Sequence, residues 1–259
     1  MKELYKKNEI TFSVVMIVIY VLGMSIMMNI SKAAGLPNFF ELMFAVSFTR
    51  LLVSFIGKEE LRDKTGLCVP KVPAKNAAYY LPMYFVAVLP LFCGVKAQGG
   101  ATEMTLFVCK MLFVGFLEEI MFRGFLYKAI QKQNDKRAVV ISALTFGVGH
   151  AVNLLNGSSV FETVIQILFA VGVGFMLVFI VRRTGSLIHC MLFHGLNNAL
   201  TGFISGSLLI KLTGSERNAV IIEVAVRLAI TVGYTLWLIK CVEPLKAEKT
   251  AVPTKHGRR

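Results

Sequence analysis

The sequence predicts an all-α, polytopic membrane protein, a bundle of about eight transmembrane helices with both termini in the cytoplasm. The chain of 259 residues is 56% hydrophobic and 17% charged. Apolar segments of about 20 residues recur along it, and lysine and arginine concentrate in alternate connections between them. No segment of useful length remains for a soluble domain, so we expect residues 1–259 to form a single integral membrane domain.

Eight segments have the length and the apolar content of a membrane-crossing helix. In chain order they are residues 10–30, 39–56, 77–95, 104–127, 139–155, 160–181, 186–205 and 219–239. The first segment is longer than the apolar region of a signal peptide, and no good cleavage site follows it, so we expect it to be retained. The longest connection, residues 57–76, carries mixed charges and two prolines, and we expect it to lie along the membrane interface.

Lysine and arginine predict the orientation of these segments. If the N-terminus is cytoplasmic, 20 basic residues flank the spans on the inner side and four on the outer side. The inner residues are Lys2, Lys6, Lys7, Lys58, Arg62, Lys64, Lys71, Lys75, Lys128, Lys132, Lys136, Arg137, Arg182, Arg183, Lys240, Lys246, Lys249, Lys255, Arg258 and Arg259. The outer residues are Lys32, Lys96, Lys211 and Arg217. Because basic residues accumulate on the cytoplasmic side, we expect an even number of spans with both termini inside. The net charge of +13 therefore indicates membrane topology and attraction to anionic lipid, and no nucleic acid is required.

The cysteines do not form a recognisable motif. The five residues stand singly, without paired spacing, and are Cys68, Cys93, Cys109, Cys190 and Cys241. We interpret them as small residues of the helix core rather than as a disulfide or redox system.

Charged residues within a span are costly, at least about 2.5–3.5 kcal/mol each at the helix centre, so each one needs an explanation. Both aspartates, Asp63 and Asp135, lie in inner connections, which excludes the paired-aspartate type of intramembrane protease. We expect Glu41, Glu103 and Glu162, at outer helix ends, to be solvated carboxylates.

Two further groups of charged residues lie in spans. Glu223 and Arg227 stand four residues apart on one helical face, which predicts a structural ion pair. Arg50 and Lys110 have no partner on their own helices, and we leave them unassigned.

The remaining polar residues lie at a common depth in three predicted spans. They are Glu118, Glu119 and Arg123 in the fourth, His150 in the fifth, and His194 and Asn198 in the seventh. With a rise of about 1.5 Å per residue, Glu118, His150, His194 and Asn198 lie about 12–18 Å from the inner ends of their helices. Unrelated residues would scatter in depth, so we predict that these side chains share one site. His189 lies off the His194 face and near the inner end, and we leave it out.

Helical spacing separates the roles of these residues. Glu119 and Arg123 are four residues apart and share a face, so we expect Arg123 to neutralise Glu119. Glu118 is turned by about 100° and has no partner on its helix, which suits a general base. His194 and Asn198 are also four residues apart and aim two polar groups at one point.

The strings LEEIMFRG, FGVGH and FHGLNN contain the motifs EExxxR, FxxxH and HxxxN, in that order and on separate predicted helices. This pattern resembles that of the CPBP family, also called the Abi family, of CAAX proteases and bacteriocin-processing enzymes. The first three spans carry nothing diagnostic. The resemblance implies an intramembrane endopeptidase whose eight-helix fold encloses a water-filled cavity open to the cytoplasm, with its catalytic core in residues 97–205.

The resemblance also implies a role for each motif residue. Glu118 takes the position of the catalytic glutamate, with Glu119 and Arg123 as its structural neighbours. Phe146 and His150 form the second motif, and the third motif supplies His194 and Asn198.

We expect Glu118 to deprotonate a water held between it and His150, while His194 and Asn198 donate hydrogen bonds to the oxyanion, each typically worth about 3 kcal/mol. This mechanism needs no cofactor. The alternative, since the family is often described as metalloproteases, is a zinc ion held by Glu118, His150 and His194 with water in the fourth position. The HExxH motif of zincins is absent.

Two other function classes remain open. A transporter would also carry ionisable residues at mid-membrane depth, but the chain lacks the internal repeats and paired broken helices expected of one. A non-catalytic binding or bacteriocin self-immunity protein fits the same motifs. We expect a peptide or lipidated-protein substrate, the lipid bilayer as the other partner, and a bacterial plasma membrane with the site reached from the cytoplasmic side.

Overall fold

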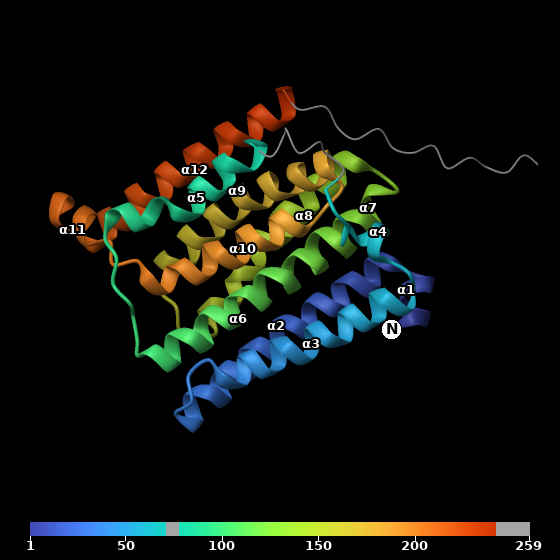
Figure 1. Cartoon of the computed structure of the whole chain (residues 1–259), viewed down its shortest axis with the longest axis horizontal. Helices are drawn as coiled ribbons and strands as arrows, with labels where there is room; N and C mark the ends of the chain where they lie inside the picture. The colour runs from blue at the N-terminus through green and yellow to red at the C-terminus, as the bar shows by residue number, and fades with distance from the viewer. Residues whose placement is uncertain (71–77, 242–259) are drawn as a thin grey trace, which may run out of the picture.

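The computed structural model describes residues 1–70 and 78–241, and over these residues the protein is all-helical (Figure 1). The α-helices are α1 (Lys2–Lys7), α2 (Glu9–Ala34), α3 (Phe39–Lys58), α4 (Arg62–Thr65), α5 (Leu81–Val88), α6 (Ala101–Glu119), α7 (Lys128–Gln131), α8 (Asp135–Gly149), α9 (Val160–Thr184), α10 (Ile188–Leu200), α11 (Ser207–Thr213) and α12 (Glu216–Cys241). The 3-10 helices are η2 (Leu89–Cys93), η4 (His150–Leu154) and η5 (Thr201–Phe203), and η3 (Ile120–Tyr127) is a π-helix. The described chain contains no β-strand, only an isolated antiparallel bridge between Val95 and Ile204.

Five of the described helical segments are long and apolar enough to cross a membrane. They are α2, α3, α8 continued by η4, α9 and α12. The other three predicted spans differ in length or charge. The segment 78–93 is shorter and changes from α5 to η2 at Leu89, because the next residue, Pro90, lacks the N–H that would continue the α-helix. The fourth, α6, carries four charged residues, and α10 has only 13 residues. Eight crossings therefore stay a prediction.

α6 lies at the centre of the bundle, where it packs against α3 and α10 (Figure 1). α2 contacts α3 and η3, while α8 packs on α9, which α12 also contacts. The close approach of α6 and α10 depends on glycine, because a Cβ atom at Gly115 would lie 2.3 Å from the backbone nitrogen of Gly195. Small residues allow this kind of contact between membrane helices. The approach brings the fourth and seventh predicted spans together.

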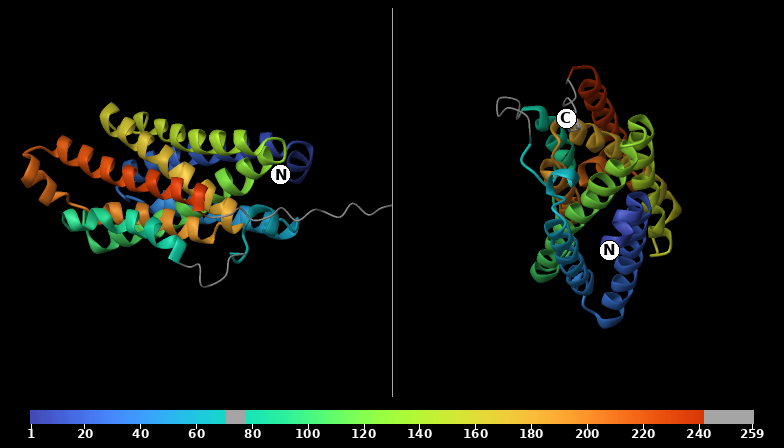
Figure 2. Two further views of the ribbon diagram at one scale, coloured as in Figure 1. Left: turned by 90° about the horizontal axis from the view of Figure 1, so that it is seen from above. Right: turned by 90° about the vertical axis from the view of Figure 1, so that its right-hand side faces the viewer.

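The N-terminus and the last described turn of α12 lie at the same end of the bundle (Figures 1 and 2). We call this the N-terminal end. The opposite end, where the connection between α2 and α3 lies, we call the far end. An even number of crossings requires both termini at one end. The side of the membrane that each end faces remains a prediction.

Aromatic rings close the bundle at the N-terminal end. Tyr5 of α1 makes edge contacts with Phe12, Phe55 and Phe125 at centroid distances of 5.2, 5.7 and 6.1 Å. Such pairs typically contribute about 0.5–1.5 kcal/mol beyond burial. The rings join α1, α2 and α3 to η3.

Part of the predicted topology lies outside the described residues. The predicted interfacial connection 57–76 is described as far as residue 70 and contains the short helix α4. The basic residues that lie outside the described residues are Lys71, Lys75, Lys246, Lys249, Lys255, Arg258 and Arg259.

Candidate active site

Glu118 and Glu119 are the last two residues of α6, at the point where the α-helix changes to the π-helix η3. All eight residues of η3 are buried. π-helical turns within α-helices occur frequently at functional sites. The sequence predicted one continuous helix over 104–127. In the structure the α-helix ends at Glu119 and a π-helix follows it, a change of helix type that the sequence did not indicate.

Glu119 and Arg123 form the ion pair that their spacing predicted. Arg123 Nη1 lies 2.8 Å from Glu119 Oε1, and both side chains are 0% exposed. The guanidinium also donates from Nη2 to the carbonyl of Gly174 at 3.4 Å and stacks 4.2 Å from the ring centroid of Phe146. The same Glu119 oxygen contacts His194 Nδ1 at 2.9 Å. Glu119 therefore connects the first motif to the third.

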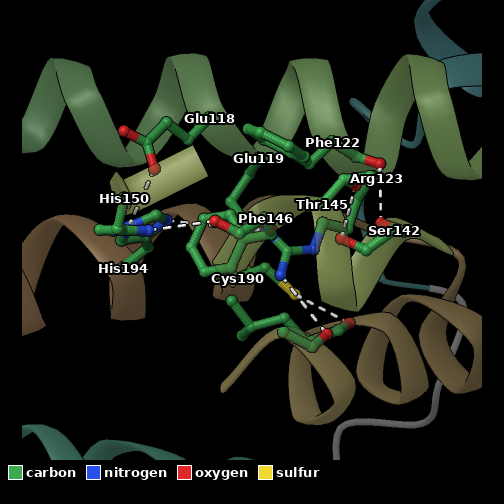
Figure 3. Close-up of polar contacts among 12 residues, drawn as sticks. Glu118, Glu119, Phe122, Arg123, Ser142, Thr145, Phe146, His150, Cys190 and His194 are labelled. Carbon is green, nitrogen blue, oxygen red and sulfur yellow. Dashed lines mark hydrogen bonds and ion pairs between the residues drawn. The ribbon is translucent and has the colours of Figure 1, made fainter. Parts of the chain in front are cut away.

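His194 lies between the two glutamates (Figure 3). A carboxylate that is paired with arginine only accepts hydrogen bonds, so Nδ1 of His194 carries a proton and donates to Glu119. The other ring nitrogen, Nε2, lies 3.7 Å from Glu118 Oε2. This separation is too long for a direct hydrogen bond. It allows both atoms to contact one reacting group.

His150 is oriented in a similar way. Its Nδ1 lies 3.0 Å from the carbonyl oxygen of Phe146, and because a carbonyl only accepts, Nδ1 is the donor. The Phe146 ring packs edge-on against both imidazoles, at 5.3 Å from His150 and 5.4 Å from His194. Figure 3 shows the two imidazoles close together near Glu118 with Phe146 beside them. The second motif thus supplies both His150 and the Phe146 ring that packs against the two imidazoles.

Asn198 lines the same cavity as Glu118 and His150. Its Oδ1 accepts a hydrogen bond from Nδ2 of Asn197 at 3.3 Å, and Asn197 Oδ1 in turn accepts one from Arg227. These contacts leave Nδ2 of Asn198 to donate to a ligand. Asn197 did not feature in the predicted site, yet it connects Asn198 to α12.

Tyr20 is a site residue that the sequence did not indicate. Its hydroxyl donates to Glu118 Oε1 at 2.9 Å, and the side chain is 5% exposed. Glu118 has no partner on its own helix, as expected, but the folded bundle brings the Tyr20 hydroxyl of α2 to its carboxylate. A tyrosine in an apolar span gives no local signal of this role, because α2 and α6 meet only in the packed structure.

A cavity of about 240 Å³ adjoins these groups. At the site its lining includes Tyr20, Glu118, His150 and Asn198. It continues between apolar and polar side chains of the half of the bundle nearer the far end, which are Val21, Met24, Ser25, Met28, Glu41, Lys110, Met111, Val114, Val152, Asn153, Asn156 and Gln166. The aromatic residues that close the N-terminal end do not belong to this lining. The cavity therefore extends from Glu118 toward the far end.

Glu41 departs from the prediction of a solvated helix end, which is wrong. The residue is 4% exposed and lines the cavity, because the start of α3 packs inward against α6. It accepts a hydrogen bond from the Ser31 hydroxyl and lies 3.8 Å from Lys110 Nζ. Glu103 and Glu162 are exposed as expected, and Glu162 completes the capping box of α9.

The predictions for residues beyond the cluster agree with the structure. Glu223 and Arg227 form an ion pair at 3.3 Å. His189 lies apart from the candidate site, where its ring stacks on Tyr80 at 3.7 Å and its Nδ1 lies 3.0 Å from the Tyr84 hydroxyl.

The described residues do not form a ready-made zinc site. A catalytic zinc needs three protein ligands at about 2.0–2.2 Å from one point. Within residues 1–70 and 78–240, no three His, Cys, Asp or Glu side chains are grouped to hold a metal ion, so Glu118, His150 and His194 do not fit that arrangement. The four cysteines whose side chains are described, Cys68, Cys93, Cys109 and Cys190, are free thiols.

Comparison with known proteins agrees with the motifs. Residues 100–200 match the family model described as Rce1-like, type II CAAX prenyl endopeptidase Rce1-like. The matched segment runs from α6 to the end of α10 and contains all three motifs. No curated protein matches the chain. Over residues 100–200, the chain is similar to the CAAX protease family that its motifs predicted.

Proposed function

We propose that the protein is an intramembrane endopeptidase that hydrolyses a membrane-associated peptide, of CAAX type or a peptide precursor, with a water activated by Glu118. The observation that carries the proposal is the 3.7 Å approach of Glu118 Oε2 to His194 Nε2 beside the cavity. Peptide hydrolysis needs a base for the water and donors for the oxyanion, and these side chains have the required chemistry.

In the proposed reaction Glu118 accepts a proton from water as the water oxygen bonds to the substrate carbonyl carbon. The carbonyl oxygen becomes an oxyanion in the tetrahedral intermediate. When the C–N bond breaks, Glu118 returns the proton to the leaving nitrogen, so the products are a carboxylic acid and an amine. Tyr20 holds the other oxygen of Glu118, which keeps Oε2 turned toward His194.

Asn198 and His194 are the proposed oxyanion donors, each typically worth about 3 kcal/mol. Asn198 donates from Nδ2, since its Oδ1 is engaged by Asn197. His194 donates from Nε2 as an imidazolium, and the buried Glu119 carboxylate at Nδ1 stabilises this positive charge. The charges of Glu118, Glu119, Arg123 and His194 then sum to zero.

We propose further that the protein is a multi-pass membrane protein with both termini in the cytoplasm. The resemblance implied access to the site from the cytoplasm. The described cavity lining runs instead toward the far end, which the predicted topology puts outside.

The direct test uses purified protein in lipid nanodiscs, with farnesylated CAAX-ended peptides and unprenylated precursor-like peptides as substrates. We expect mass spectrometry to detect cleavage of one class, and we expect Glu118→Ala and His194→Ala to abolish it. Cleavage that survives in both variants would contradict the proposed site. Peptide binding by the wild type without any product would favour a binding or immunity role instead.

The zinc alternative has its own test. We expect protein freed of metal by a chelator, and verified by elemental analysis, to keep its peptidase activity. Activity that disappears with the metal and returns in proportion to added zinc would replace the glutamate mechanism with a metal-dependent one.

A further inference from the structure

A chain of polar contacts connects α12 to the candidate site. Arg227 of α12 donates from Nη2 to Asn197 Oδ1, and Asn197 donates from Nδ2 to Asn198 Oδ1 at 3.3 Å. Asn198 lines the cavity, whereas Arg227 and Asn197 do not. Arg227 also lies outside the segment 100–200 that carries the three motifs. The contacts therefore reach one of the two proposed oxyanion donors from a helix outside that segment.

Arg227 is buried and held on several sides. Its side chain is 6% exposed as a residue, and it donates from Nε to the carbonyl oxygen of Val86 at 3.1 Å. Its Nη1 donates to Glu223 at 3.3 Å, and its guanidinium lies 4.2 Å from the ring centroid of Phe169. Together these contacts fix the plane of the guanidinium, and the remaining terminal nitrogen, Nη2, is bonded to Asn197.

The contact between Arg227 and Val86 follows from a helix break. In an α-helix the carbonyl of one residue accepts from the N–H four positions later. For Val86 that position is Pro90, which has no N–H, and the N–H of Leu89 is bonded to Phe85 instead. The carbonyl of Val86 is thus left for Arg227. The proline that interrupts the predicted third span therefore helps to anchor the arginine.

The chemistry of the donors fixes the orientation of both amides. A guanidinium only donates hydrogen bonds, so Asn197 must turn Oδ1 to Arg227, which leaves its Nδ2 to donate to Asn198. Asn198 therefore accepts with Oδ1 and keeps Nδ2 as a donor. If Asn198 were reversed, its carbonyl oxygen would take the place of that donor and would repel an oxyanion.

We propose that Arg227 is a positioning residue of the hydrolytic site, which acts through Asn197 to hold the Asn198 amide with its N–H groups toward the reacting carbonyl oxygen. The inference rests on the proposed peptidase function, and it gives Arg227 a role beyond its ion pair with Glu223. Arg227 contacts no reacting atom in this account. Its charge fixes which end of the Asn198 amide serves the oxyanion.

The kinetic test uses Asn197→Asp, which keeps the shape of the side chain but has two acceptors and no donor. One carboxylate oxygen would still bind Arg227, and the other would accept from Nδ2 of Asn198, which reverses the Asn198 amide. We expect kcat for peptide cleavage to fall about a hundredfold or more, the usual loss for one oxyanion donor, with little change in KM. Asn218→Asp, the same substitution at the exposed start of α12, is the control and should keep kcat.

Asn197→Leu separates positioning from a purely structural role. Leucine bonds to neither neighbour, so the Asn198 amide can rotate and Arg227 loses one acceptor. We expect a kcat between those of the wild type and Asn197→Asp, but the lowest melting temperature of the three, because the aspartate variant keeps an acceptor for the guanidinium. If kcat instead followed the melting temperature, with Asn197→Asp as active as the wild type, the inference would be overturned.

A double variant distinguishes orientation of the amide from the added negative charge. In an Asn198→Ala background the group through which Arg227 acts is gone, so Asn197→Asp should change kcat by no more than about twofold. The same large loss in the presence and in the absence of Asn198 would assign the effect to charge and would overturn the inference.

A binding measurement makes the test independent of turnover. It compares two analogues of a cleaved peptide in nanodiscs, a phosphinate with an anionic oxygen at the position of the carbonyl oxygen and an ethylene-linked peptide without it. We expect the wild type and Asn218→Asp to bind the phosphinate at least about tenfold more tightly, and Asn197→Asp to lose this preference, because hydrogen bonds to charged groups contribute more than neutral ones.

The two readouts separate failure of this inference from failure of the proposed function. Equal affinity of the wild type for both analogues would overturn the inference. A phosphinate preference that is lost in Asn197→Asp, in a protein that cleaves no peptide, would support positioning by Arg227 and contradict the peptidase proposal. Peptide cleavage and a phosphinate preference that both persist in Asn197→Asp would support the peptidase and contradict the inference.

Discussion

Each imidazole of the candidate site is held through Nδ1 by an acceptor. His194 donates to the buried carboxylate of Glu119 and His150 to the carbonyl of Phe146, at 2.9 and 3.0 Å. Such contacts fix which ring nitrogen faces the reacting groups. Glu119 therefore positions His194 and pairs with Arg123, and it does not line the cavity. Glu118, the other glutamate of the motif, does line it.

We predict that Tyr20→Phe lowers kcat about tenfold and changes KM little. The substitution removes only the hydroxyl that holds Glu118 Oε1 at 2.9 Å, so the carboxylate loses its fixed orientation while the cavity keeps its shape. Steady-state kinetics with a cleavable peptide checks this. A rise in KM with an unchanged kcat would show that Tyr20 contacts the substrate instead.

We predict that Glu119→Gln destabilises the protein by about 3–5 kcal/mol, the usual cost of leaving one member of a buried ion pair alone. Arg123 would keep its charge at 0% exposure without its partner. Thermal unfolding in one detergent measures the change. Glu103→Gln, at the exposed end of the same helix, is the control and should leave the melting temperature unchanged. Equal melting temperatures for the wild type and Glu119→Gln would contradict the structural role.

The sequence could predict the residues that share a helix but not those that meet between helices. Helical spacing was enough for Glu119 with Arg123, and common depth was enough to join Glu118 with His194. The contacts of Tyr20 with Glu118 and of Lys110 with Asn38 depend on which helices are neighbours. Hydropathy does not contain that information, and the same limitation made the prediction for Glu41 wrong.

At the scale of elements, α6 is the helix on which the site depends. It packs against α3 and α10, and its change to a π-helix begins directly after Glu119. Hydropathy predicted where helices occur, because apolar segments must be helical in a bilayer. It did not predict their type or their breaks, since the π-helix and the short α10 depend on packing within the bundle.

We predict that Gly115→Ala destabilises the bundle by about 1–3 kcal/mol and reduces activity. The new methyl group would lie 2.3 Å from the nitrogen and 2.7 Å from the Cα of Gly195, so α10 must move and carry the adjacent His194 with it. Gly233→Ala in α12 is the matched control. Its Cβ meets no atom within 4 Å, so we expect a neutral effect or a stabilisation of up to about 1 kcal/mol. If both variants behave alike, close packing of α6 on α10 is not essential.

At the scale of the whole molecule, the bundle has one end closed by aromatic rings and a cavity that extends toward the other. The rings of Tyr5, Phe12, Phe55 and Phe125 lie at the N-terminal end. The distribution of lysine and arginine in the sequence predicted that the N-terminal end is cytoplasmic, whereas the direction of the cavity is known only from the packed helices. Together, the predicted orientation and the cavity direction predict that the cavity is reached from the outer side of the membrane.

We predict that a cysteine at Met24, which lines the cavity, reacts with a membrane-impermeant maleimide from the outer face of intact cells. The native cysteines must first be replaced. Lys136→Cys, at the exposed start of α8, should react only after the cells are opened and so fixes the topology independently. Reaction of Met24→Cys only after the cells are opened would support access from the cytoplasm, as the resemblance implied.

The most direct test of the proposed enzyme is the single-turnover rate of peptide cleavage by Glu118→Gln, with peptide affinity measured on the same preparation. The variant keeps the shape of the side chain and removes its ability to accept a proton. We expect the rate to fall by at least about a hundredfold, the usual contribution of a general base, while the affinity stays within about twofold. Cleavage by Glu118→Gln within a few-fold of the wild-type rate would contradict the role of Glu118 in hydrolysis.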